Sequence, residues 1–335
     1  MSRVPQVHNT QNGVTAGVWR DGDVIIKGLR HTAPDAPAQW QPSNDPRAWN
    51  YWRREAFAYE SGLPRRLGLL GPELIDETET GAGVEVTVTA FTGRTASQLT
   101  VDDLAELAVQ LGSGQGRGHQ PDDPWLSRGF LREYSTTRVA GHELFADEHR
   151  WRQALVEPYV DDSLRRDLVA LHAARDRLLA IAEALPRTVC HLDLFPANVF
   201  ATDAGIGLID WSFSGDGAIG EDIGNLIPDS VFDRDLPIAA LPELEERVIA
   251  GYLAGLRESG WRGSDRLAIL GVHASAVKYD WLAPRLLARA GDESHTRYGG
   301  AETDGSELFA ARWEGLRLIT RWANDALADA DRLRL

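Results

Sequence analysis

One stretch in the second half of the chain constrains its fold and chemistry more than any other. Among apolar residues it carries Asp193, then Asn198 five positions later, then Asp210 twelve positions further on. Residues 199–201 and 206–209 are apolar and flank a turn-forming segment, so the pattern predicts a β-hairpin. The hairpin would bring Asn198 at its start and Asp210 at its end close together in space.

These side chains are of the kinds that bind a hard cation and accept a proton. An amide oxygen and a carboxylate suit Mg²⁺, which takes oxygen ligands and keeps waters and phosphate oxygens in the rest of its shell. Asp193, on the loop before the hairpin, would then accept the proton of an attacking hydroxyl group. Kinases divide the work in this way, with a catalytic-loop Asp, an Asn five residues later and a second Asp for the metal.

The stretch resembles the aminoglycoside phosphotransferase family, the small-molecule branch of the protein-kinase-like fold. That family carries His-Gly-Asp where protein kinases have His-Arg-Asp, and Asp-Trp or Asp-Phe where they have Asp-Phe-Gly. This chain has His191-Leu192-Asp193 and Asp210-Trp211. It therefore resembles the small-molecule branch more than the protein kinases, although Leu192 departs from the family's glycine. No long activation segment ending in Ala-Pro-Glu follows Asp210, which also disfavours a protein kinase.

The resemblance implies a two-lobed α+β protein-kinase-like fold, with a small β-rich N-terminal lobe and a larger, mainly helical C-terminal lobe. The nucleotide-binding lobe would span residues 1–92. The catalytic and acceptor-binding lobe would span residues 93–335, with acceptor-pocket helices within 229–335. Identifiable motifs cover residues 12–227, and the resemblance is loose thereafter.

Lys27 is the candidate phosphate-binding residue of the N-terminal lobe. Two strands joined by a turn are predicted over residues 13–27, and Lys27 lies on the second, apolar strand, where a charge needs a partner. A helix predicted over residues 49–61 offers Glu55, with Glu60 as the alternative. By the resemblance, Lys27 would hold the α- and β-phosphates and Glu55 would hold Lys27 in place.

Further nucleotide contacts follow from the resemblance. Thr15 and Ala16 would belong to the nucleotide loop, and Thr89 and Phe91 to the hinge, where backbone groups would contact the adenine edge. ATP is the expected nucleotide, GTP is not excluded, and Mg²⁺ is the expected metal. The chain holds 35 Lys and Arg residues in all, of which only Lys27 and Lys278 are Lys, which suggests that Lys27 serves as a compact point charge.

The composition limits the partners. A net charge of −15 argues against nucleic-acid or anionic-membrane partners. It favours a cationic or neutral small-molecule acceptor, although solubility explains the charge equally well. The sequence shows no apolar run of 18 residues and no apolar N-terminal segment, and its single cysteine, Cys190, is expected in the core, so a cytoplasmic location is expected. A partner protein is expected only if the acceptor is a peptide.

The remaining pattern predicts mainly helices. Asp222, in the family's small-residue loop and helix, would brace the catalytic loop through backbone hydrogen bonds. The segment 31–47 would fold over the nucleotide, extend the cleft or be disordered. The predicted helices are 100–112, followed by a Gly-rich surface loop over 112–120, then 144–155, 162–185, 242–258, 266–289 and 305–327.

The acceptor is the open question. Acidic groups near the site would hold ammonium groups and aromatic rings would stack on a sugar or cation, although a solvated face or core packing explains such residues as well. The expected reaction is phosphorylation of a hydroxyl on an aminoglycoside-like antibiotic or related metabolite. Alternatives are a sugar, an amino alcohol, a nucleoside antibiotic or a Ser/Thr of a biosynthetic peptide, or a catalytically silent nucleotide-binding scaffold. The candidate acceptor residues are Tyr279, Asp280, Trp281, Glu302, Asp304 and Glu307.

Overall fold

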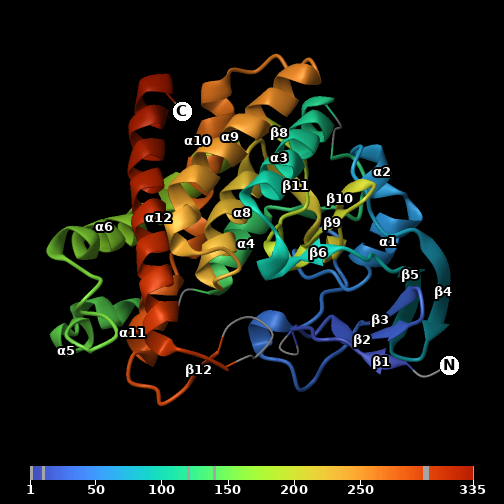
Figure 1. Cartoon of the computed structure of the whole chain (residues 1–335), viewed down its shortest axis with the longest axis horizontal. Helices are drawn as coiled ribbons and strands as arrows, with labels where there is room; N and C mark the ends of the chain where they lie inside the picture. Colours follow the sequence, from blue (N-terminus) through green and yellow to red (C-terminus); the bar gives the residue numbers. More distant parts are fainter. Residues whose placement is uncertain (1–2, 10–11, 119–120, 139–140, 297–301, 335) are drawn as a thin grey trace.

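The N-terminal part of the chain forms an antiparallel sheet. The computed structural model describes residues 3–9, 12–118, 121–138, 141–296 and 302–334. The first strands are β1 (Val4–Pro5), β2 (Thr15–Asp21), β3 (Val24–Arg30), β4 (Leu74–Thr80) and β5 (Gly83–Thr89). They pair in the order β1-β2-β3-β5-β4 and lie at the lower right of Figure 1. Val84, Val86 and Val88 of β5 are buried at alternate positions, as a half-buried strand requires.

Helices dominate the rest of the molecule. The helices are α1 (Arg54–Glu60), α2 (Leu63–Arg66), α3 (Val101–Gly116), α4 (Phe130–Thr137), α5 (Glu148–Trp151), α6 (Asp162–Ala173), α7 (Arg175–Ala184), α8 (Glu221–Phe232), α9 (Leu241–Glu258), α10 (Asp265–Ala274), α11 (Leu282–Arg289) and α12 (Gly305–Leu333). Short 3-10 segments include η3 (His142–Ala146), η4 (Pro196–Asn198), η5 (Trp211–Phe213) and η7 (Ser275–Tyr279). The other strands are β6 (Arg94–Thr95), β7 (Ser127–Arg128), β8 (Arg187–Cys190), β9 (Val199–Thr202), β10 (Gly205–Leu208), β11 (Gly215–Ala218), β12 (His295–Thr296) and β13 (Glu302–Thr303).

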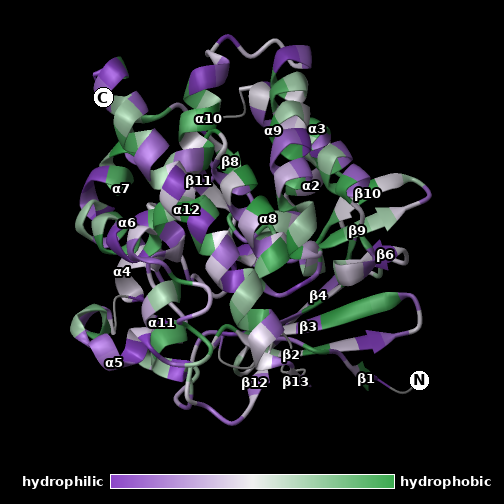
Figure 2. Cartoon of the chain, turned by 60° about the vertical axis from the view of Figure 1, so that its left-hand side comes forward, coloured by the Kyte–Doolittle hydropathy of each residue, from purple (hydrophilic) through white to green (hydrophobic). Residues whose placement is uncertain are grey.

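This arrangement confirms the predicted two-lobed α+β protein-kinase-like fold. Figures 1 and 2 both show β2 and β3 on one side of the molecule and α9, α10 and α12 on the other. The division between residues 92 and 93 stays a prediction. Cys190 is buried, as expected.

The core of the helical part lies around α8 and α12. Every residue of α8 except Asp229 is buried. In α12, Trp313 and Trp322 are fully buried, and hydrophobic and hydrophilic residues alternate along this helix in Figure 2, as expected of an amphipathic helix. This core supports α8 and the loops that precede it, where the polar residues of the site lie.

The Gly-rich loop predicted over residues 112–120 is wrong for residues 112–116, because α3 continues to Gly116; residues 119–120 lie outside the described ranges. A Cβ atom added to Gly112 would lie 2.2 Å from the Tyr252 carbonyl oxygen of α9. A Cβ atom added to Gly255 of α9 would lie 2.0 Å from the Val109 carbonyl oxygen of α3. The glycines therefore allow two helix backbones to pack closely, and this tertiary contact outweighs the low helix propensity of glycine.

Other predicted helices differ in extent. The helix predicted over 49–61 begins only at Arg54, since the preceding residues form turns and the Trp49 amide donates to Glu133 at 3.0 Å. The helix predicted over 162–185 is two helices that meet at Ala174, and α6 is capped by Asp161.

Three further segments were predicted incorrectly or left open. The helix predicted over 266–289 is interrupted by η7, and the one over 144–155 is reduced to η3 and α5. Segment 31–47 is packed rather than disordered, because Trp40 is buried against Trp49.

Candidate active site

The predicted hairpin is confirmed. β9 and β10 pair antiparallel, from Val199 opposite Leu208 to Thr202 opposite Gly205. The Ile209 amide donates to the Asn198 carbonyl at 3.0 Å. Because Asp210 follows Ile209 directly, this bond holds Asn198 and Asp210 at neighbouring ends of the hairpin.

Lys27 connects the sheet, α1 and the hairpin. Its ammonium lies 2.5 Å from a Glu55 oxygen and 3.0 Å from a carboxylate oxygen of Asp210. The Tyr59 hydroxyl donates to the other Glu55 oxygen at 3.0 Å, so the Glu55 carboxylate is held from both sides. Glu60, the alternative partner, is exposed. The structure therefore pairs Lys27 with Glu55, as the resemblance implied.

The charges of this cluster stabilise one another. Burial lowers the pKa of Lys27, but Asp210 and Glu55 raise it by more, so the pKa lies above the usual lysine value. Burial raises the pKa of Asp210, yet Lys27 and its other partners bring it below the usual aspartate value. At neutral pH the site therefore keeps an ammonium beside a carboxylate.

Asp193 occupies a different environment on the loop before η4. Burial raises the pKa of Asp193 to about 7, opposed by Lys278 and reinforced by Asp210 and Asp229. The Asn198 amide nitrogen donates to the Asp193 carbonyl at 2.9 Å. This bond leaves the amide oxygen of Asn198 available to a cation and fixes the Asp193 backbone.

Asp222 braces the catalytic loop, as predicted. One carboxylate oxygen accepts the His191 amide at 2.9 Å and the Gln115 side chain at 2.8 Å, and the other accepts the Leu192 amide at 2.8 Å. The His191 ring nitrogen Nε2 bonds the Ile209 carbonyl at 2.9 Å. α8 thus holds the loop that carries Asp193, and His191 holds this loop against the hairpin.

Leu192 takes a backbone conformation that suits glycine. Its φ is +67°, in the left-handed region, and its side chain is fully buried. An L-residue other than glycine, Asn or Asp pays about 1–2 kcal/mol for this conformation. Burial of the leucine side chain compensates, since truncating such a side chain to alanine costs about 2–5 kcal/mol.

We therefore expect Leu192→Gly to be more stable than Leu192→Ala by about 1 kcal/mol. Both variants lose the buried contacts that the leucine side chain makes beyond Cβ, but only glycine relieves the backbone. Urea denaturation of the two variants measures the difference. In ordinary backbone conformations the order is the reverse, so an alanine variant that is the more stable would contradict the strain at this position.

Arg54 is a structural residue of the site that sequence reasoning missed. Its side chain is fully buried on α1 and donates to the Trp125 carbonyl at 3.0 Å and the Ser212 carbonyl at 3.3 Å. Further bonds reach the carbonyls of residues 46, 48 and 49. Arg54 therefore ties the helix that carries Glu55 to the segment directly after Asp210.

The remaining predicted nucleotide contacts lie around the sheet. Thr15 is buried at the start of β2, and Ala16 is exposed where the register of β2 and β3 shifts. The Thr89 hydroxyl accepts the Glu73 amide at 2.9 Å, so its side chain serves the local backbone. Phe91 stacks on Phe200 of β9 with ring centroids 5.8 Å apart, which joins the predicted hinge to the hairpin.

The acidic residues proposed for the acceptor are engaged elsewhere. The Asp280 carboxylate lies 3.2 Å from His142 and 2.8 Å from His172. Glu307 pairs with Arg234, and the Asp304 side chain caps α12. The prediction that these side chains hold ammonium groups therefore loses its basis for all three. Glu302 lies on β13 at the surface.

Together the fold and the cluster of Lys27, Glu55 and Asp210 define a phosphotransferase that acts on hydroxyl groups. The chain matches the model of the phosphotransferase enzyme family (APH) over residues 44–267. It belongs to this family. No curated protein sequence matched.

Solved structures with TM-scores above 0.5 share the fold at low sequence identity. A choline/ethanolamine kinase family protein from Mesorhizobium loti is 14% identical, with 98% of this chain and 91% of that chain covered and a TM-score of 0.53. Amicoumacin kinase hAmiN, in complex with AMP-PNP, Ca²⁺ and Ami, is 12% identical, with 95% of this chain and 88% of that chain covered and a TM-score of 0.52. Aminoglycoside phosphotransferase APH(3'')-Id from Streptomyces rimosus is 16% identical, with 82% of this chain and 92% of that chain covered and a TM-score of 0.49.

None of the helices in the described part of the chain is both long and apolar enough to span a membrane.

Proposed function

We propose that this protein transfers the γ-phosphoryl group of ATP to a hydroxyl group of a small molecule. The observation that carries the proposal is the contact of Lys27 with both Glu55 and Asp210, beside the loop that carries Asp193 and Asn198. GTP in place of ATP remains an alternative. Thr15, Ala16, Thr89 and Phe91 would contribute to the nucleotide site through the backbone and packing around β2 and the hinge.

The residues present fit a magnesium nucleotide. The Asn198 amide oxygen and the Asp210 carboxylate are oxygen ligands at neighbouring ends of one hairpin, and Asn198 is buried. The Lys27 ammonium contacts the Asp210 carboxylate, and an ammonium at this place suits a phosphate group. When bound, Mg-ATP supplies the phosphoryl group and a cation that neutralises its charge.

Each residue then has a defined role. Lys27, held by Glu55, binds the phosphates, and Asn198 and Asp210 bind Mg²⁺. Asp193 orients the acceptor hydroxyl and takes its proton at a carboxylate oxygen. Most of the rate enhancement comes from positioning and charge neutralisation by these preorganised groups.

Transfer of labelled γ-phosphate from Mg-ATP to a panel of acceptors tests the proposal. The panel contains aminoglycosides, sugars, amino alcohols, nucleoside antibiotics, hydroxy acids and a Ser/Thr-rich peptide. Label on a small molecule supports the proposal, and label on an aminoglycoside would support a role in antibiotic resistance. Label on the peptide alone would replace the small-molecule acceptor by a biosynthetic peptide. Nucleotide binding with no transfer to any acceptor would favour a silent scaffold.

The pKa of Asp193 sets an expected pH dependence. A base must be deprotonated, and with a pKa of about 7 the active fraction rises about tenfold between pH 6 and pH 8. The transfer rate at substrate concentrations well below saturation, which reports the pKa values of the ligand-free protein, should follow this rise.

Glu55, whose pKa burial raises to about 7, titrates in the same range, but its protonation would loosen Lys27 and weaken ADP binding. ADP affinity measured over the same pH range therefore separates the two groups. A transfer rate that is flat between pH 6 and pH 8 would argue against Asp193 as the base.

A further inference from the structure

The second lysine of the chain, Lys278 on η7, is a buried cation near Asp193. Its side chain is only 5% exposed, and its ammonium lies 3.9 Å from the Asp229 carboxylate, which is too far for a hydrogen bond. The rings of Tyr134 and Tyr279 lie 5.5 Å and 5.8 Å from the ammonium. No residue in the described ranges accepts a hydrogen bond from it. A buried ammonium without an acceptor is costly, so this group is available to a ligand.

Arg138, directly after α4, is a second cation in the same place. Its guanidinium carbon lies 4.3 Å from the Tyr134 ring, 4.9 Å from Trp40 and 4.7 Å from Trp281. Within the part of the chain that the structure describes, it forms neither a hydrogen bond nor an ion pair. The guanidinium carries five N–H donors, and the three aromatic rings hold it in a fixed position without satisfying them.

Trp281 adds a third donor. Its indole nitrogen is buried and has no hydrogen-bond partner among the described residues, and an indole can only donate. Trp281 contacts Arg138, and both Arg138 and Lys278 contact the Tyr134 ring. An ammonium, a guanidinium and an indole N–H therefore gather around Tyr134 and Trp281 with no acceptor to match them.

Carboxylates near the two cations balance part of their charge without accepting their hydrogen bonds. Asp229 lies 3.9 Å from the Lys278 ammonium, and Lys278 and Arg138 lower the pKa of both Asp193 and Asp229, but neither carboxylate is within hydrogen-bond distance of the Lys278 ammonium or pairs with Arg138.

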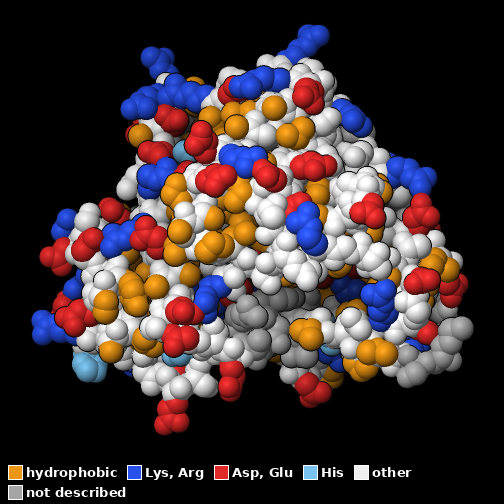
Figure 3. Space-filling model, viewed as in Figure 1, with side chains coloured by type: hydrophobic (Ala, Val, Ile, Leu, Met, Phe, Trp, Pro, Cys, Tyr) orange, Lys and Arg blue, Asp and Glu red, His pale blue; other side chains and the backbone are white. Residues whose placement is uncertain are grey.

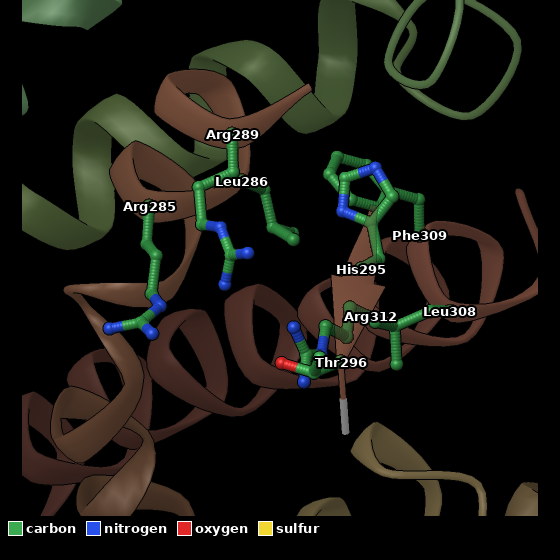
Figure 4. A pocket seen from close by; sticks show the side chains of 8 residues that line it. All are labelled: Arg285, Leu286, Arg289, His295, Thr296, Leu308, Phe309 and Arg312. Carbon is green, nitrogen blue, oxygen red and sulfur yellow. The ribbon is translucent and has the colours of Figure 1, made fainter. Parts of the chain in front are cut away.

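Burial lowers the pKa of Arg285, and Arg289, Arg138 and Arg312 lower it further, which reflects an excess of cations on this side. Figure 4 shows Arg285 and Arg289 projecting from α11 on the same side. The pocket drawn there has a volume of only 10 Å³, about one water molecule, so it does not hold an acceptor.

The donor cluster also lies beside the reacting position. Lys278 and Arg138 both lower the pKa of Asp193 against the effect of burial. Trp40, Trp49 and Phe213 form one buried cluster with Leu192, the neighbour of Asp193, and Tyr134 packs against that cluster. Figure 3 shows the surface hollowed between the helical part and the sheet, with Lys or Arg side chains at the hollow.

We propose that Lys278, Arg138 and the Trp281 indole bind an oxyanion of the acceptor, so that the acceptor is a hydroxylated organic anion with an apolar or aromatic body. This inference rests on the proposed function for the place of the reacting hydroxyl at Asp193. The oxyanion accepts hydrogen bonds from the three donors, and the body of the acceptor packs on the aromatic rings. An ammonium group at this place would find no hydrogen-bond acceptor among these three donors.

Three acceptor analogues that share one body and differ in the charge of a single substituent test the inference. They are benzyl alcohols with a carboxylate, a hydroxymethyl or an aminomethyl group in the para position. Ligand-observed NMR titration, with Mg-ADP bound to the full chain, gives their affinities. We expect the carboxylate to bind at least tenfold more tightly than the amine, with the neutral compound between them. Equal or reversed affinities, or no binding of any of the three, would overturn the inference.

Variants identify the groups responsible. Lys278→Met and Arg138→Gln should each reduce the preference for the carboxylate to less than threefold. The matched control is Arg132→Gln on α4, because the Arg132 guanidinium already pairs with Glu183 at 2.6 and 2.9 Å, and it should keep the full preference. Arg138 is at a helix end and half-buried, so its variant tests the inference even if Lys278→Met fails to fold. A preference that survives Arg138→Gln and any folded Lys278 variant would contradict it.

Nucleotide binding distinguishes a failure of this inference from a failure of the proposed function on which it rests. If the wild-type protein does not bind ADP, the proposed function fails. If ADP binds but the charge preference is absent, only the acceptor inference fails. If Lys278→Met weakens AMP-PNP at least tenfold more than ADP and leaves the charge preference intact, the anion that Lys278 holds is the γ-phosphate, and its assignment to the acceptor is wrong.

Discussion

Replacing Asp193 by Asn should reduce phosphoryl transfer about 10³-fold and leave ADP affinity within a factor of two. The amide is nearly isosteric but takes no proton from the acceptor hydroxyl, and general-base catalysis contributes about 10²–10⁴-fold. The loop should keep its shape, because Asn198 bonds the backbone carbonyl of residue 193 rather than its side chain. Single-turnover transfer and calorimetric ADP titration measure the two effects.

A matched control is Asp203→Asn, which changes an exposed carboxylate in the turn of the same hairpin. It should retain both transfer and ADP affinity. Transfer that persists in Asp193→Asn at more than a tenth of the wild-type rate would contradict the role of Asp193 as the base. A parallel loss of ADP affinity would instead assign Asp193 a part in holding the nucleotide.

Asp222→Ala should lower the free energy of unfolding by about 3–5 kcal/mol, which is a large part of the stability of a typical protein. The buried carboxylate accepts two backbone amides of the catalytic loop and the Gln115 side chain. Alanine leaves these donors buried without acceptors, and each such loss costs about 1–3 kcal/mol. Urea denaturation monitored by circular dichroism measures the change.

The more conservative Asp222→Asn separates the hydrogen bonds from the volume of the side chain. Its amide oxygen still accepts from one side while its NH₂ group faces a donor, so we expect about half of the loss. Transfer should fall in both variants, because the backbone of His191 and Leu192 sets the position of Asp193. A loss below about 1 kcal/mol in Asp222→Ala would show that the loop does not depend on this carboxylate.

The sequence predicts the parts of the site that local patterns encode. The hairpin follows from two apolar runs around a turn, and it places Asn198 and Asp210 together whatever surrounds it. Lys27 was identifiable because an isolated charge on an apolar strand needs a partner, and Glu55 is the carboxylate that meets it. These inferences required only neighbours in the chain and the family resemblance.

Other features depend on contacts between distant segments. The helix through Gly112 exists because α9 approaches closely enough to need glycines, which no local pattern shows. The break at Ala174 has neither Gly nor Pro to mark it. Arg54 has no signal in the sequence beyond its position next to Glu55.

The acceptor side was the least predictable. The acidic residues chosen for it satisfy His142, His172 and Arg234 instead. Lys278 lies 85 positions after Asp193 and is brought near it by helix packing, and its one signal in the sequence is that lysine is so rare in this chain. A site assembled from side chains this far apart is visible only once the chain is folded.

The most direct test of the account is ADP affinity with and without Mg²⁺, measured by calorimetry on the wild-type protein and on Lys27→Met and Asp210→Asn. The account predicts that the wild type binds ADP and that Mg²⁺ strengthens the binding. Lys27→Met should bind at least tenfold more weakly, and Asp210→Asn should lose the effect of Mg²⁺. A wild-type protein that binds no ADP, or variants that bind it as the wild type does, would contradict the placement of the nucleotide between Lys27 and Asp210.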